Sequence, residues 1–200
     1  MSEKVITRVF YISLIITGSF IVWGLIPNSI LPEANLKNIT DQIQTFIVSK
    51  FAWFYLLSAT AFLIFAIFLV VSKYGNIVLG KDGDKPEYNY LTWFGMLFSA
   101  GMGIGLVFWG AAEPISHFNA PPYSLESESD AAKVAMRYSF FHWGLHPWAI
   151  YSTLALALAY FQFRKDKPGL ISSTLTPLFG EKMEGGYGTL VNVIAVFATV

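Results

Sequence analysis

The sequence contains no cysteine and few charged residues, and each shortage excludes a class of protein. Without cysteine the chain forms no disulfide, no thiolate metal site and no thiol nucleophile. Charged residues make up 13% of the 200 positions, against about 25% in ordinary soluble domains. Acidic and basic residues number 13 each, so the net charge is zero and no basic surface for nucleic acid is expected. A water-soluble domain is therefore excluded.

The few charges leave long apolar segments, which predict membrane helices. Five stretches of 16 to 26 residues contain no charge at all: 9–32, 51–72, 88–112, 138–163 and 185–200. A helix needs about 20 apolar residues to cross the hydrocarbon core of a bilayer. Four stretches are long enough, and the fifth reaches the last residue, where we expect it to be cut off. The sequence predicts an all-α, polytopic membrane helix bundle with about five transmembrane helices.

The distribution of lysine and arginine predicts the orientation of these helices. Segments on the side of the N-terminus carry nine of the 13 basic residues, and the opposite side carries four. Because basic residues accumulate on the cytoplasmic side, we expect a multi-pass protein with a cytoplasmic N-terminus.

The third apolar stretch contains glycine at every second position: Gly101, Gly103 and Gly105. One interpretation is close helix packing, since Gly101 and Gly105 have the small-xxx-small spacing. The other is an unwound segment at mid-membrane, whose free carbonyl and N–H groups bind an ion or a substrate. Both interpretations remain open on spacing alone.

Glu113 and Pro114 end the same stretch. A carboxylate at this point can relay an ion or a proton. The alternative, which we favour, is an interfacial residue in front of a proline that ends the helix.

The fourth stretch combines histidine and aromatic residues. His142 and His146 are four residues apart, a spacing that can hold a metal, but helix–helix hydrogen bonds are the more ordinary role. Trp143, Trp148 and Tyr151 fit either an interfacial belt or a cavity. A cavity lined by aromatic faces suits a quaternary ammonium group, which forms no ordinary hydrogen bond.

Three segments together closely resemble the betaine/choline/carnitine transporter (BCCT) family: GMGIG at 101–105, FWGAAEP at 108–114 and FHWGLHPWAIY at 141–151. Within that family the sequence is most similar to bacterial glycine betaine transporters. The resemblance implies a LeuT-like inverted-repeat fold in which two peripheral helices, about 9–31 and 51–71, precede the first repeat. Helices of the first repeat would lie at about 91–112, 138–161 and 189–200, all within one transporter domain of which 1–200 is the N-terminal part.

The resemblance also implies roles for particular residues. Substrate would meet Ala100, Met102, Trp143, Trp148 and Tyr151. Sodium would be bound by the backbones of Ser99 and Met102 and, at a second site, by Thr199. Gly101, Gly103 and Gly105 would form the unwound helix. Gly105 stands where proton-driven choline carriers of the family tend to have aspartate, which favours sodium coupling.

We therefore expect a secondary active transporter in a bacterial cell membrane, taking up glycine betaine or a related quaternary ammonium osmolyte with sodium. No catalytic residue, no cofactor and no metal beyond sodium are expected, and the full-length protein could form a homotrimer. Family members are much longer, so we expect the chain to be a truncated fragment. Two alternatives are a non-transporting membrane fragment that assembles with a partner, and an intramembrane metalloenzyme using His142 and His146.

Overall fold

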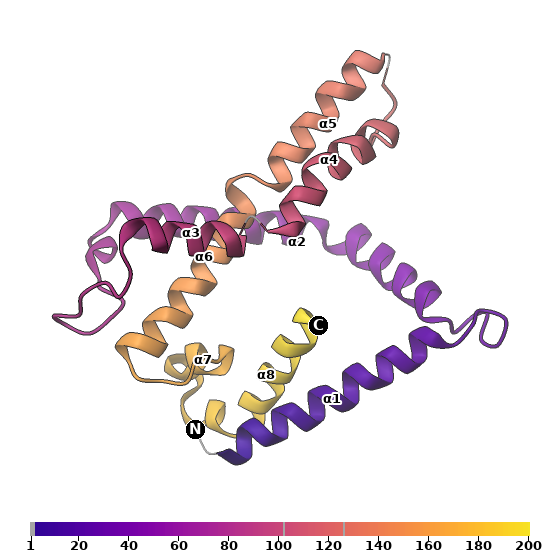
Figure 1. Ribbon diagram of the computed structural model, residues 1–200. Coiled ribbons are helices and arrows are strands. Elements are labelled where there is room, and N and C mark those ends of the chain that lie inside the picture. The colour runs from indigo at the N-terminus through magenta and orange to yellow at the C-terminus, as the bar shows by residue number, and fades with distance from the viewer. Residues whose placement is uncertain (1–2, 102, 126) are drawn as a thin grey trace. The chain divides into compact units, whose positions relative to one another are not determined.

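The computed structural model describes residues 3–101, 103–125 and 127–200, and for 3–7, 100, 101 and 104 only the backbone. These residues form helices and loops with no β-strand, so the all-α prediction is confirmed (Figure 1). The α-helices are α1 (Glu3–Leu25), α2 (Leu36–Val71), α3 (Tyr90–Gly101), α4 (Ile104–Asn119), α5 (Glu128–His142), α6 (Leu145–Ala159), α7 (Ile171–Phe179) and α8 (Gly186–Thr199). Shorter helical turns are η1 (Lys73–Asn76), η2 (Tyr160–Arg164) and η3 (Gly180–Glu184).

Two of the described helices, α1 and α2, are long and apolar enough to cross a membrane. α2 has 36 residues and none of them is buried within the chain. At a rise of 1.5 Å per residue it extends about 54 Å, more than the roughly 30 Å hydrocarbon core. Its charge-free part, residues 51–71, matches the core, and its polar residues 36–50 extend beyond it.

The third apolar stretch is two helices, because α3 ends at Gly101 and α4 begins at Ile104 after Gly103. Glycine weakens a helix interior by about 1 kcal/mol relative to alanine. The expectation that Pro114 ends a helix was wrong, because Pro114 lies inside α4, which continues to Asn119. Proline itself adopts the helical φ, so the helix can continue past it without the hydrogen bond that an N–H would donate.

The fourth stretch is also interrupted, between α5 and α6. Trp143 ends α5 as its C-cap, and α6 begins at Leu145. A Cβ on Gly144 would lie 2.6 Å from the Phe140 carbonyl oxygen, so the close backbone approach here requires glycine. Pro147 lies in the first turn of α6, where an N–H has no helical partner and its loss has little cost.

The chain divides into two compact units: Met1–Ser58, Asn76–Lys81 and Thr153–Val200 form the first, and Ala59–Gly75 and Asp82–Ser152 the second. In the first unit α8 packs on α1, where Phe20 and Phe197 meet edge to face at 4.8 Å, and on α7 (Figure 1). Between α7 and α8 the Asn192 side chain accepts from the Ser172 N–H (3.1 Å) and donates to the Ser172 hydroxyl (2.9 Å).

In the second unit α4 and α5 lie side by side as a helical hairpin (Figure 1). Ala131, Val134 and Ala135 form the buried face of α5. The Ser127 hydroxyl caps the helix by accepting from the Asp130 N–H at 3.2 Å.

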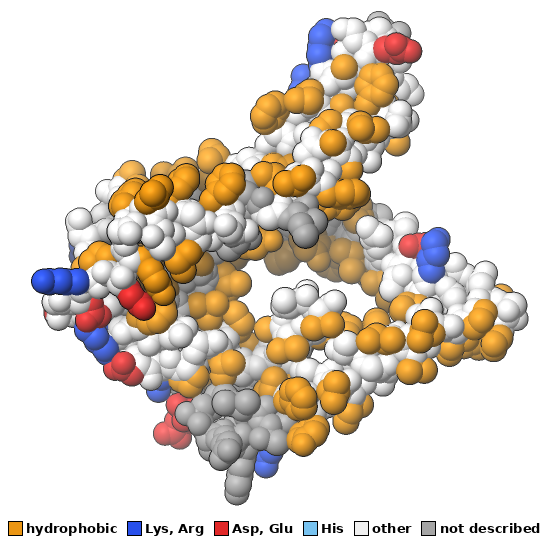
Figure 2. Space-filling model, viewed as in Figure 1, with side chains coloured by type: hydrophobic (Ala, Val, Ile, Leu, Met, Phe, Trp, Pro, Cys, Tyr) orange, Lys and Arg blue, Asp and Glu red, His pale blue; other side chains and the backbone are white. Residues whose placement is uncertain are grey.

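Most large apolar side chains of the described residues are exposed, and Figure 2 shows them spread over the viewed surface. Fully buried apolar residues are few and small, such as Ala135, Ala149 and Val193. A surface this apolar is stable in lipid or against other helices, and not in water.

Candidate functional site

Glu113 connects α4 to the junction between α5 and α6. Its Oε2 accepts a hydrogen bond from the Trp143 indole N–H at 2.5 Å. Its Oε1 contacts His142 Nδ1 and lies 3.3 Å from His117 Nε2. The carboxylate is 13% exposed, so both of its oxygens are engaged in a largely enclosed position. This arrangement fixes the position of the Trp143 ring from a neighbouring helix.

Trp148 and Tyr151, on the first half of α6, lie next to each other. Their ring centroids are 6.3 Å apart with planes inclined by 50°. The Trp148 indole N–H donates to the Trp143 carbonyl at 3.1 Å, so its donor is used and its ring faces remain available. Both rings are largely exposed within this chain. Electron-rich faces of this kind attract a cation that has no hydrogen-bonding groups.

The glycine residues lie at the interruption between α3 and α4. Gly101 is the last residue of α3, Gly103 caps α4, and Gly105 is within the first turn of α4. Ser99 and Ala100 are in the last turn of α3. The predicted ion and substrate contacts of Met102 fall outside the described residues. At Gly103 a Cβ would come within 3.3 Å of the Ser99 carbonyl oxygen, so the two backbones approach closely here.

Thr199 is the last residue of α8, in the first unit. Its hydroxyl donates to the Ala195 carbonyl at 2.8 Å, the ordinary back-bond of a helical threonine. The hydroxyl oxygen keeps its lone pairs, which is the property that a sodium ligand requires.

His142 and His146 have different partners. His142 meets Glu113, whereas His146 Nε2 lies 3.5 Å from the Thr60 hydroxyl on α2. The rings of Phe141 and His146 are 5.2 Å apart. Both histidines thus make polar contacts with a side chain of another helix, the role that the sequence favoured.

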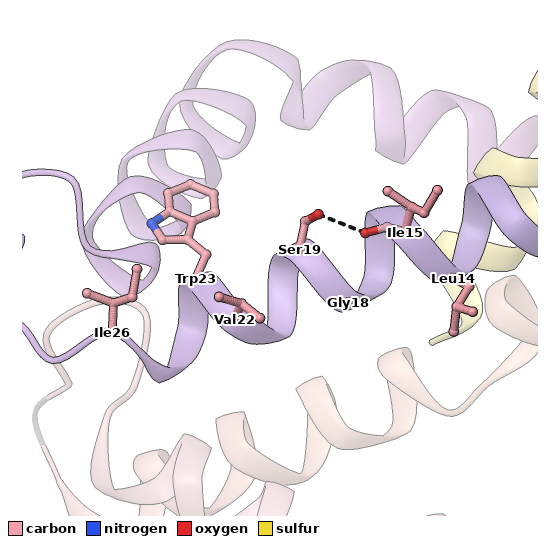
Figure 3. Close-up of a pocket in the computed structure, with 7 residues that line it drawn as sticks. All are labelled: Leu14, Ile15, Gly18, Ser19, Val22, Trp23 and Ile26. Carbon is pink, nitrogen blue, oxygen red and sulfur yellow. Dashed lines mark hydrogen bonds between the residues drawn. The ribbon is translucent and has the colours of Figure 1, made fainter.

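A concavity in the first unit lies along α1 and is lined by Leu14, Ile15, Gly18, Ser19, Val22, Trp23 and Ile26 (Figure 3). Its polar side chains are engaged locally: Ser19 donates to the Ile15 carbonyl (2.8 Å) and the Trp23 indole to the Ala34 carbonyl (2.8 Å). Neither leaves a donor for a solute. This face of α1 suits lipid or another helix better than a polar substrate.

The sequence analysis missed the cluster formed by Glu113, His117 and His142. Glu113 and His117 are four residues apart, and residues at that spacing share one face of a helix, so two of the three members could be placed together from the sequence. Their partner His142 is 29 residues from Glu113, and no local sequence pattern predicts a contact between two helices.

Comparison with known proteins identifies the relatives of this chain. Residues 8–200 match the sequence pattern of BCCT, the betaine/carnitine/choline family transporter. The glycine betaine transporter OpuD of Bacillus subtilis is 53% identical over 98% of this chain and 38% of its own length. A probable glycine betaine transporter of Desulfitobacterium hafniense is 46% identical over 99% of the chain and 39% of its own length. An ectoine/hydroxyectoine transporter of Virgibacillus pantothenticus is 43% identical over 96% of the chain and 37% of its own length.

The chain thus spans less than two fifths of the length of these curated relatives. The family match nevertheless covers nearly all of this chain, including the glycine stretch and the aromatic segment of α6. The chain therefore belongs to the betaine/carnitine/choline (BCCT) family, whose members are membrane transporters and not enzymes.

Proposed function

We propose that the protein containing this chain is a secondary active carrier that takes up glycine betaine, or a related quaternary ammonium osmolyte, with sodium. The single observation that carries the proposal is the aromatic group at the α5–α6 junction. Trp148 and Tyr151 lie next to each other with their ring planes inclined by 50°, and Trp143 is held by Glu113. Each aromatic face contributes about 0.5–2 kcal/mol to cation binding, depending on desolvation. Glycine betaine transporters are among the most similar relatives.

Sodium coupling is the finer part of the proposal. It is supported by the interruption between α3, which ends at Gly101, and α4, which begins at Ile104, because carbonyl groups freed at a break in a membrane helix can coordinate a cation. Ser99 and Met102 would contribute backbone oxygens there, and Thr199 a hydroxyl to a second site. Gly105 carries no carboxylate that would take the place of the ion. A zwitterionic substrate brings its own carboxylate to lie beside the sodium.

The carrier would lie in a bacterial cell membrane as a multi-pass protein with a cytoplasmic N-terminus. Alternating access around a mid-membrane site would move substrate and sodium together. A homotrimer is a further part of this proposal. A regulatory fragment that binds a longer partner is the alternative, and co-purification with a longer homologue would favour it.

The test is uptake of radiolabelled glycine betaine by proteoliposomes that contain the full-length protein, with and without an inward sodium gradient. We expect uptake that follows the sodium gradient and is inhibited by unlabelled betaine. Uptake that ignores sodium and follows a proton gradient would overturn the coupling. Uptake of ectoine with no uptake of betaine or choline would overturn the substrate class, because an ectoine/hydroxyectoine transporter is among the relatives.

A further inference from the structure

Glu113, His117 and His142 bring three metal-ligating atoms into one small space. The three side chains offer one atom each, and all of these atoms lie within 4.8 Å of one another. Glu113 and His117 come from one face of α4, and His142 is the last residue of α5. The cluster lies within the second compact unit, so one helical hairpin builds all of it.

The donor set is two imidazole nitrogens and one carboxylate oxygen. This combination binds Zn²⁺ and similar divalent transition ions, with bonds of about 2.0–2.2 Å. Tetrahedral geometry at those lengths separates the ligand atoms by about 3.3–3.6 Å. The distance between Glu113 Oε1 and His117 Nε2 is 3.3 Å, which fits, whereas Glu113 Oε1 and His142 Nδ1 lie closer together and would have to separate around an ion. We propose that Glu113, His117 and His142 form a binding site for a divalent transition metal ion, represented by Zn²⁺.

The surroundings complete the site as a metal centre would require. Ligating side chains are usually oriented by a second hydrogen bond, and the Trp143 indole N–H supplies one to Oε2, the carboxylate oxygen that faces away from the imidazoles. The ring of Tyr138 packs 5.5 Å from that of His117. Three protein ligands leave one coordination position open, which water or a small anion would take.

The three ligands differ in their exposure within this chain. The His142 side chain is 46% exposed and that of His117 is 23% exposed, whereas Glu113 is 13% exposed. The more buried carboxylate provides the negative charge, and the more exposed His142 ring is the ligand with the most freedom to adjust around an ion. The proposal goes beyond the transport function, because neither betaine nor sodium is needed for it. A bound ion would engage the same carboxylate that holds Trp143, so metal and aromatic ring would be coupled.

The test is equilibrium binding of Zn²⁺ to the purified chain in lipid nanodiscs, followed by calorimetry, with Co²⁺ as a spectroscopic probe. We expect one ion per chain and the strong visible absorption of a four-coordinate Co²⁺ centre. His117→Ala and His142→Ala should each weaken Zn²⁺ binding by more than the roughly 10- to 100-fold loss caused by removal of an outer hydrogen-bond partner. His146→Ala is the matched control, because this histidine meets Thr60 and not Glu113, and its Zn²⁺ affinity should equal that of the parent.

Glu113→Gln provides a second variant if a histidine variant fails to fold. Glutamine keeps the volume and an acceptor for Trp143 and removes the charge, so Zn²⁺ binding should be lost while far-ultraviolet circular dichroism stays unchanged. Three results would overturn the site: no stoichiometric Zn²⁺ binding by the parent, a six-coordinate Co²⁺ spectrum, or equal affinity in His117→Ala and His146→Ala. In each of these cases the cluster only positions Trp143.

Discussion

Two polar clusters of this chain differ in burial and in charge. In the first unit, Ser172 and Asn192 are 2% and 3% exposed and form a neutral pair between α7 and α8. In the second unit, Glu113 engages two imidazoles and an indole, and the imidazoles are partly exposed. A buried neutral pair with its bonds made holds helices together. A charged cluster with an open side can also receive a ligand, and this difference separates a structural from a functional polar group.

The largest effect should come from breaking the neutral pair with Asn192→Leu. This change leaves the Ser172 N–H and hydroxyl buried without partners, at about 1–3 kcal/mol for each group. Thermal unfolding in detergent, followed by intrinsic fluorescence, should show a lower midpoint. Ser172→Ala removes only the hydroxyl and keeps the bond to its N–H, so it should cost less. An unchanged midpoint in Asn192→Leu would contradict the structural role of the pair.

The next effect should come from Gly144→Ala at the α5–α6 junction. The added methyl group would lie 2.6 Å from the Phe140 carbonyl oxygen, so the backbone has to shift. We expect a loss of about 1–3 kcal/mol, as for other overpacked positions, and weaker betaine uptake because Trp143 moves. The matched control is Gly110→Ala in α4, where no atom lies within 4 Å. That change should leave uptake intact and stabilise the helix by up to about 1 kcal/mol. Equal stability and equal uptake in Gly144→Ala and Gly110→Ala would contradict the proposed clash at Gly144.

Trp143→Ala tests the functional side of the comparison directly. Loss of one cation–π face corresponds to about 0.5–2 kcal/mol, so the apparent KM for betaine uptake should rise by roughly 2- to 30-fold while sodium dependence persists. Trp143→Phe keeps an aromatic face and loses the N–H bond to Glu113. Its KM should lie between that of the parent and that of Trp143→Ala. An unchanged KM in Trp143→Ala would take this ring out of the substrate site.

The smallest effect concerns a polar contact that is exposed and local, at the start of α5. The Ser127 hydroxyl caps the helix, and its removal in Ser127→Ala should cost about 1 kcal/mol. Hydrogen bonds from Ser127 and Lys133 hold the pKa of Asp130 below its usual value. A lowered pKa means that this contribution is present above about pH 4 and is lost as the pH falls through the lower folded value. The difference in helix stability between parent and Ser127→Ala should therefore be largest above about pH 4 and should shrink as the pH falls below that value.

The sequence predicted those features that depend on local chemistry. Absence of charge predicted helices in lipid, and the spacing of Gly101, Gly103 and Gly105 allowed an interruption where α3 and α4 meet. The prediction that Pro114 ends its helix was wrong, because α4 continues through this residue. Helix α7 was not anticipated either, because its nine residues are too few to cross a membrane and include Pro177.

The candidate site was less predictable than the fold. The aromatic residues of α6 could be named from the sequence, since their chemistry suits a cation. The contact that holds Trp143 could not be named from the sequence, because Glu113 is 30 residues away and on another helix. The roles of Ser99, Ala100, Met102 and Thr199 rest on resemblance and remain predictions. Contacts between helices depend on tertiary packing, which no local spacing encodes.

The pairing of α5 with α4 has a consequence for how the chain is synthesised and inserted. α5 has only 15 residues and carries Glu128, Asp130, Lys133 and Arg137. Charged residues at the centre of a membrane helix cost about 2.5–3.5 kcal/mol each during insertion, and these four lie in the first ten residues of α5, before the charge-free stretch 138–163. The apolar α2, in contrast, can partition as soon as it leaves the ribosome. We therefore expect insertion to draw the charge-free stretch into lipid and to leave the charged first part of α5 outside it, in contact with α4.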